Sequence, residues 1–175
     1  MQSSKSIALE LQGGLAVVSL VNPARGNPID GGFGRELKEV TAMLLGSSEV
    51  RAVLLQAQGK NFSFGGDLKV FHAAGEELAP LVLEWTAELH MALQRLWRLP
   101  VPIVAAAQGF VMGGALSLLA GSDVVVAGKS AKLGSAFSQI GFSCDSGSSV
   151  TLAARMGVAR ARRFVLLAET LDSEE

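Results

Sequence analysis

Apolar residues recur along the chain with two periods, and the two kinds of segment alternate. Short apolar or alternating stretches, typical of strands, lie at residues 7–12, 15–21, 50–56, 103–107 and 124–127. Apolar positions at helical spacing lie between or after them, at residues 33–45, 78–99, 115–120, 148–156 and 160–168. Strands that alternate with helices in this way predict an α/β fold.

Glycine and proline mark where several of these elements end. The Gly-Gly pair at residues 13–14 separates the first two strands and predicts a hairpin turn. Pro100 and Pro102 are expected to end the long helix. Residues 132–141 are predicted to be irregular or extended. The acidic residues at 172–175 are typical of the first turn of a further helix.

Composition narrows the class of protein. The chain has 175 residues, of which 49% are hydrophobic, and a mean hydropathy of +0.38, enough for one domain with a core. A net charge of -1 disfavours nucleic acid or an anionic membrane surface as a partner. The single cysteine, Cys144, excludes an internal disulfide. No apolar leader or bilayer-length run is present, so we expect a cytoplasmic protein, and we expect no metal site.

Two stretches combine a strand, glycines and a helix, and they carry the candidate chemistry. Residues 103–122 run from a buried strand through Gly113 and Gly114 into a helix. Upstream, Gly65 and Gly66 follow another strand, and the next residue, an aspartate, is a predicted N-cap. Such junctions present free backbone N–H groups, and two of them together could hold one developing oxyanion. An ordinary turn without a ligand remains the alternative.

The two stretches resemble a known family. KNFSFGGDLK at residues 60–69 and AAAQGFVMGGALSLLAGSDVVVAG at residues 105–128 are similar to the signature segments of the crotonase superfamily, the enoyl-CoA hydratase/isomerase family. The resemblance implies a spiral of ββα units with two roughly perpendicular sheets, assembled as a homotrimer or hexamer. It also implies that the N–H groups of Gly66 and Gly114 hold the thioester oxygen of an acyl-CoA. Coenzyme A would be part of the substrate, with no separate cofactor.

The resemblance also implies where the substrate binds and how far the chain extends. Residues 25–29 match the loop that contacts the CoA phosphates and adenine, although Arg25 alone is equally consistent with a solvated charge. The implied substrate-binding residues are Arg25, Phe64, Gly65, Asp67, Leu68, Lys69, Gly113 and Phe137. We expect residues 1–175 to form one acyl-CoA-binding core that lacks the family's C-terminal helical segment.

The acid/base group is where the sequence departs from the hydratases. The positions of the two hydratase glutamates hold Ser117 and Phe137 here, and neither side chain is a carboxylate base. SAFSQIGFSCDSGSS at residues 135–149 resembles instead an isomerase branch that acts on epoxyphenylacetyl-CoA, in which Asp145 would move the proton. From spacing alone, an N-cap before the next helix is the simpler role for Asp145.

The sequence is also compatible with other functions. A branch of 4-chlorobenzoyl-CoA dehalogenases uses an aspartate at this position as a nucleophile and a histidine from the preceding helix, which would be His90. A lone helical histidine is more often a packing or surface residue. An enoyl-CoA hydratase, or a weakly active CoA-binding subunit, is the remaining alternative. The acyl group, aromatic or straight-chain, is not specified.

Overall fold

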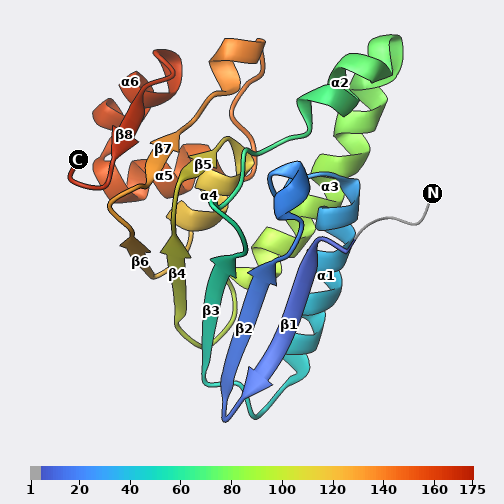
Figure 1. Cartoon of the computed structure of the whole chain (residues 1–175), viewed down its shortest axis with the longest axis vertical. Coiled ribbons are helices and arrows are strands. Elements are labelled where there is room, and N and C mark those ends of the chain that lie inside the picture. The colour runs from blue at the N-terminus through green and yellow to red at the C-terminus, as the bar shows by residue number, and fades with distance from the viewer. Residues whose placement is uncertain (1–4) are drawn as a thin grey trace.

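The computed structural model of the chain describes residues 5–175. Its larger sheet has the strand order β1-β2-β3-β4-β6. These strands are β1 (Ile7–Gln12), β2 (Leu15–Leu20), β3 (Ala52–Ala57), β4 (Ile103–Ala107) and β6 (Val124–Ala127). β1 and β2 form the expected antiparallel hairpin, and the other neighbouring pairs are parallel (Figure 1).

A smaller sheet lies beyond the carboxyl ends of these strands. It contains β5 (Phe110–Met112), β7 (Lys132–Gly134) and β8 (Thr170–Asp172), in the order β5-β7-β8. Ser63 extends it by one bridge to Val111. Successive turns of the chain therefore give one segment to each sheet: β3 then Ser63, β4 then β5, and β6 then β7. This repetition, with a helix after each pair, confirms the predicted α/β fold of ββα units.

Within the described part of the chain, six α-helices surround the sheets. They are α1 (Gly31–Gly46), α2 (Leu68–Ala74), α3 (Leu78–Leu96), α4 (Gly114–Ala120), α5 (Ser148–Met156) and α6 (Val158–Leu166). Short 3-10 turns occupy Pro23–Arg25, Gly75–Glu77 and Phe137–Ile140. α1 and α3 pack against each other along one face of the larger sheet, whereas α4, α5 and α6 lie near the smaller sheet (Figure 1).

The core lies between the larger sheet and its helices. Val18, Val53 and Ala105 from neighbouring strands have no exposed surface and belong to this core. Leu37 of α1 and Leu93 of α3 meet them from the helical layer and are buried to within 2%. Because the sheet is fixed in this way, the loops that follow its strands are held at one edge.

The structure corrects three details of the predicted elements. Residues 172–175 do not begin a helix: Leu171 packs on the core, and β8 pairs antiparallel with β7. The backbone N–H groups after β8 instead donate to the Asp172 carboxylate, in a local turn. The long helix ends at Leu96 rather than at residue 99, before Pro100. Residues 110–112 form a strand that the apolar pattern alone did not predict.

Candidate functional site

The two glycine junctions lie side by side. Ser63 N–H donates to the Phe110 carbonyl at 3.0 Å, and Met112 N–H donates to the Ser63 carbonyl at 3.0 Å. This pairing brings Gly65 so close to the second junction that a Cβ there would lie 2.6 Å from the Met112 oxygen. Gly65 also has φ +82, a conformation that glycine adopts without strain. The close approach of the two junctions therefore depends on glycine.

Two backbone N–H groups are free where the junctions meet. Gly66 and Gly114 line one cavity, together with Gly113. Gly113, with φ 56, is the N-cap of α4, so Gly114 lies in the first turn, where N–H groups have no helical partner. Within residues 5–175, neither the Gly66 nor the Gly114 N–H donates a hydrogen bond to another residue. Both donors are thus available to a ligand oxygen.

Asp145 lines the same cavity and is largely removed from water. Its Oδ1 accepts a hydrogen bond from Ser146 Oγ at 2.8 Å. Burial raises the pKa of the Asp145 carboxyl, and the Ser146 hydrogen bond and the neighbouring His90 offset this only in part. The alternative role as an N-cap is wrong, because α5 begins at Ser148 with Gly147 as its N-cap and no side-chain cap.

His90 does not line the cavity but contacts the residue that follows Asp145. The side chain is on an exposed part of α3 and is not among the cavity-lining residues. Its Nε2 accepts a hydrogen bond from the backbone N–H of Ser146 at 3.1 Å. A nitrogen that accepts a hydrogen bond carries no proton, so Nε2 in this arrangement supports the Asp145–Ser146 turn.

Apolar and aromatic side chains form most of the cavity wall. The Phe71 ring centroid lies 5.8 Å from that of Trp85 and 5.6 Å from that of Phe142. Further apolar lining comes from Ile29, Leu68, Val82, Leu89, Phe137 and Ile140. One buried hydroxyl interrupts this wall, because Ser135 Oγ has no hydrogen-bond partner within residues 5–175. The wall suits an apolar acyl group.

No carboxylate stands at the two positions where the sequence resemblance places the hydratase glutamates. Ser117 is fully buried in α4, and its Oγ lies 2.6 Å from Ser148 Oγ. Phe137 is buried and contributes its ring to the cavity. Among residues 5–175, the carboxylates that line the cavity are those of Asp30 and Asp145.

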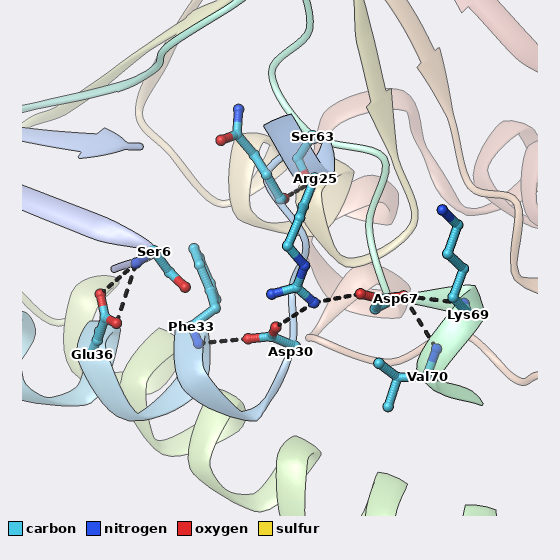
Figure 2. Close-up of polar contacts among 10 residues, drawn as sticks. Ser6, Arg25, Asp30, Phe33, Glu36, Ser63, Asp67, Lys69 and Val70 are labelled. Carbon is cyan, nitrogen blue, oxygen red and sulfur yellow. Dashed lines mark hydrogen bonds and ion pairs between the residues drawn. The ribbon is translucent and has the colours of Figure 1, made fainter. Parts of the chain in front are cut away.

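Arg25 lies between two carboxylates at the rim of the site (Figure 2). Its Nη2 is 2.5 Å from Asp67 Oδ2 and 3.3 Å from Asp30 Oδ2. Asp30 caps α1 by accepting from Phe33 N–H, and Asp67 caps α2 by accepting from the N–H groups of the second and third residues of that helix. The predicted N-cap at Asp67 is confirmed, and the charge of Arg25 is balanced within the chain.

This ion pair changes the acidity of Asp67. Burial alone would raise the pKa of Asp67, but the hydrogen bond from Arg25, the two helix N–H donors and the Arg25 charge together lower it below 3.8. The Asp67 hydrogen bond also raises the pKa of Arg25. Asp67 is therefore a fixed anion at the rim.

The other predicted substrate-binding residues lie around this rim. Phe64 is half exposed and its ring centroid is 5.5 Å from that of Phe110. Leu68 and Lys69 are exposed at the start of α2. Several lining residues were not predicted. Among them are Asp30, whose place before a helical pattern was an available N-cap signal, and Trp85, which one face of the long amphipathic helix could have suggested. Within residues 5–175, no group of histidine, cysteine and carboxylate side chains could hold a metal ion.

Comparison with known proteins shows which family the chain resembles. The family model for enoyl-CoA hydratase/isomerase matches residues 10–175. A protein of Rhodobacter capsulatus named probable enoyl-CoA hydratase is 34% identical over 173 residues, which are 99% of this chain and 65% of that protein. The 1,2-epoxyphenylacetyl-CoA isomerase of Escherichia coli K12 is 29% identical over 97% of this chain and 65% of its own length. The chain thus spans about 65% of the length of these curated relatives.

Solved structures show the same fold. An enoyl-CoA hydratase from Polaromonas sp. JS666 has a TM-score of 0.88 and 26% identity, covering 96% of this chain and 65% of its own. A Thermobifida fusca YX protein, solved in complex with acetoacetyl-CoA, has a TM-score of 0.89 and 26% identity, covering 98% and 69%. The crotonase-like fold is confirmed. No helix within residues 5–175 is long and apolar enough to cross a bilayer.

Proposed function

The chain belongs to the enoyl-CoA hydratase/isomerase family, and from this premise we propose that it is an acyl-CoA isomerase with Asp145 as its acid/base. One observation supports this most: two free backbone N–H groups, from Gly66 and Gly114, line the same cavity as a carboxylate of raised pKa. The reaction is the transfer of a proton between two carbons next to a thioester, with the accompanying shift of a double bond.

The proposed steps need no reactant beyond the substrate. Asp145 removes a proton from the α carbon of a β,γ-unsaturated thioester, and the electron pair of that C–H bond moves toward the carbonyl. The negative charge that develops on the thioester oxygen is stabilised by the N–H groups of Gly66 and Gly114. Asp145 then returns the proton to the γ carbon, and the double bond moves to the α,β position.

The environment of Asp145 suits this double role. The Asp145 carboxylate must be ionised to accept the α proton. If its carboxyl were a strong acid, it would lose that proton before returning it to the γ carbon. Burial raises the pKa of Asp145 toward that of the acidified α carbon, and the oxyanion donors lower the cost of the carbanion. Loss of one such donor costs about 10²–10³-fold in rate in other enzymes.

We also propose that the thioester is that of coenzyme A. The aromatic and glycine segment at residues 64–69, next to Arg25, would line the path of the pantetheine and nucleotide, as the family resemblance implies. A related structure contains acetoacetyl-CoA, which supports a CoA thioester as the substrate class. In this proposal the protein binds an acyl-CoA and assembles with further copies of the chain as a homotrimer or hexamer.

A second candidate is a hydrolase similar to 4-chlorobenzoyl-CoA dehalogenases, with Asp145 as nucleophile. The observation that favours it is the contact of His90 with the peptide that follows Asp145. The same contact weighs against it, because Nε2 of His90 is engaged as an acceptor and the side chain does not line the cavity. Hydration is less favoured, since Ser117 and Phe137 supply no carboxylate.

Three assays on one preparation separate these functions. We expect a β,γ-enoyl-CoA to be converted to its conjugated isomer, and expect Asp145→Asn to abolish this conversion while thioester binding persists. Ser143→Asn, two residues upstream on the surface, is the matched control. Release of halide from 4-chlorobenzoyl-CoA would favour the hydrolase, and addition of water to crotonyl-CoA would favour the hydratase. Binding without any turnover would indicate a CoA-binding subunit.

A further inference from the structure

The turn that carries Asp145 has an unusual backbone. Ser146 has φ 52 and Gly147 has φ 75, so two consecutive residues are left-handed. This conformation is easy for glycine but costs energy for serine, and it persists only where the surroundings enforce it. Ser146 is 1% exposed, so these surroundings are protein rather than solvent. Strained residues of this kind cluster at functional sites, and this serine lies next to the proposed acid/base.

Ser146 uses both its hydroxyl and its backbone. Its Oγ donates to Asp145 Oδ1 at 2.8 Å, and its N–H donates to His90 Nε2 at 3.1 Å. The hydroxyl also lies at the oxyanion donor, because a Cβ built on Gly114 would be 3.1 Å from Ser146 Oγ. One residue therefore joins the carboxylate, the oxyanion junction and α3.

The far side of the turn is also held. The Asp145 carbonyl accepts from Ser148 N–H at 2.9 Å and from Ser148 Oγ. Ser148 Oγ is in turn paired with the buried Ser117 of α4. Among residues 5–175, no other residue donates a hydrogen bond to Asp145 Oδ2, so Ser146 fixes one carboxylate oxygen and the other has no side-chain partner.

We propose that Ser146 and His90 are positioning residues for Asp145: His90 holds the strained turn, and Ser146 fixes Oδ1 so that Oδ2 exchanges protons with the substrate. This role rests on the proposed acid/base function of Asp145. A left-handed serine is the means by which one side chain reaches both the carboxylate and the Gly114 junction.

The first test measures Asp145 itself, without substrate. We would follow its carboxyl carbon by ¹³C NMR as a function of pH, assigned by its loss in Asp145→Asn. In Ser146→Ala and in Ser146→Gly, the pKa of Asp145 should rise further, because a hydrogen bond to the ionised form is lost. Ser146→Gly should melt at a higher temperature than Ser146→Ala, because glycine relieves the positive φ. The exposed Ser143→Ala is the control and should change neither quantity.

The second test uses turnover of a β,γ-enoyl-CoA. Ser146→Ala should lower kcat by roughly tenfold, the factor that matches one hydrogen bond to a charged group, with KM little changed. His90→Gln offers an amide oxygen to the Ser146 N–H and should keep most of kcat, whereas His90→Leu should lose it.

Defined outcomes overturn the proposal. An unchanged Asp145 titration in Ser146→Ala would exclude the role of the hydroxyl. Equal loss of kcat in His90→Gln and His90→Leu would mean that the imidazole itself takes part in the reaction. If the wild-type protein turns over no enoyl-CoA, the proposed function fails, but the NMR titration still decides whether Ser146 and His90 hold Asp145.

Discussion

The rim and the interior of the cavity each hold an aspartate, and the pKa values of the two carboxyls are shifted in opposite directions. Asp67 and Asp145 both lose contact with water, which by itself raises the pKa of each carboxyl. At the rim, Arg25 lies 2.5 Å from Asp67, and the net effect lowers the pKa. In the interior, Asp145 has a serine hydroxyl as its partner, and its pKa stays raised.

The difference shows that burial and the partner together decide what a carboxylate can do. A carboxylate paired with a guanidinium and two helix N–H groups remains ionised and fixes the start of α2. A buried carboxylate with a neutral partner has a raised pKa and therefore takes up a proton more readily. We therefore assign anchoring to the rim and proton transfer to the interior.

The largest effect is expected from removing an interior N–H donor. Gly114 is the first residue of α4, a position where proline is tolerated. Gly114→Pro removes the N–H and should lower kcat by about 10²–10³-fold while the protein still binds acyl-CoA. Gly114→Ala adds a similar bulk near Ser146 but keeps the donor, so it should retain far more activity. Similar kcat values for the two variants would contradict an oxyanion role for this N–H.

The next effect concerns the contact between the two junctions. A Cβ at Gly65 would lie 2.6 Å from the Met112 oxygen, at a positive φ. Gly65→Ala should therefore destabilise the fold by about 1–3 kcal/mol and reduce turnover, since the junctions must separate. Gly46→Ala is the matched control, because a Cβ there meets nothing within 4 Å. Denaturant unfolding of both variants measures the difference, and equal stabilities would contradict the close packing.

The two aspartates should also affect stability with opposite pH dependence. The lowered pKa of Asp67 stabilises the fold above its ordinary value of 3.8, and this contribution is lost as the pH falls through the lowered value. The raised pKa of Asp145 stabilises the fold at low pH, and this contribution is lost as the pH rises through the raised value. Relative to wild type, Asp145→Asn should thus gain stability with rising pH and Asp67→Asn should lose it, in unfolding curves recorded from acid to neutral pH. Parallel curves would contradict the assignment.

The smallest effect is expected at the exposed end of the rim. Arg25→Gln removes the cation that Asp67 and Asp30 share. Because the pair is partly exposed, the free energy of unfolding should fall by no more than about 1 kcal/mol. KM for acyl-CoA should rise a few-fold and kcat should stay near that of wild type. A large fall in kcat would place Arg25 in the chemistry rather than at the rim.

Much of this site could be predicted from the sequence because it depends on local signals. Glycine after a buried strand predicts a junction, and Asp67 before an apolar turn predicts a cap, without knowledge of distant residues. The alternation of strands and helices likewise follows from hydrophobic periodicity, whereas the ββα units were implied by the family resemblance. These features involve neighbours along the chain, and the structure shows the junctions and the cap where they were expected.

The remaining features depend on residues far apart in the sequence. The three-residue strand β8 exists because β7 offers it a partner, which no periodicity of residues 170–172 reveals. Arg25 contacts Asp67, which lies 42 positions away in the sequence, and Ser146 contacts His90, which lies 56 positions away. Asp145 precedes a helix, as a cap would, yet the left-handed Ser146 and Gly147 turn the chain so that the cap is glycine. Such outcomes follow from tertiary contacts, which override local preference.

In the proposed function, the interior aspartate moves the substrate proton and the rim aspartate does not. The most direct measurement is deuterium incorporation from D2O at the α and γ carbons of an enoyl-CoA, followed by NMR for wild type, Asp145→Asn and Asp67→Asn. We predict exchange in wild type, exchange within a few-fold of it in Asp67→Asn, and a loss of about 10²–10⁴-fold in Asp145→Asn. Exchange that survives in Asp145→Asn, or disappears equally in both variants, would contradict this account.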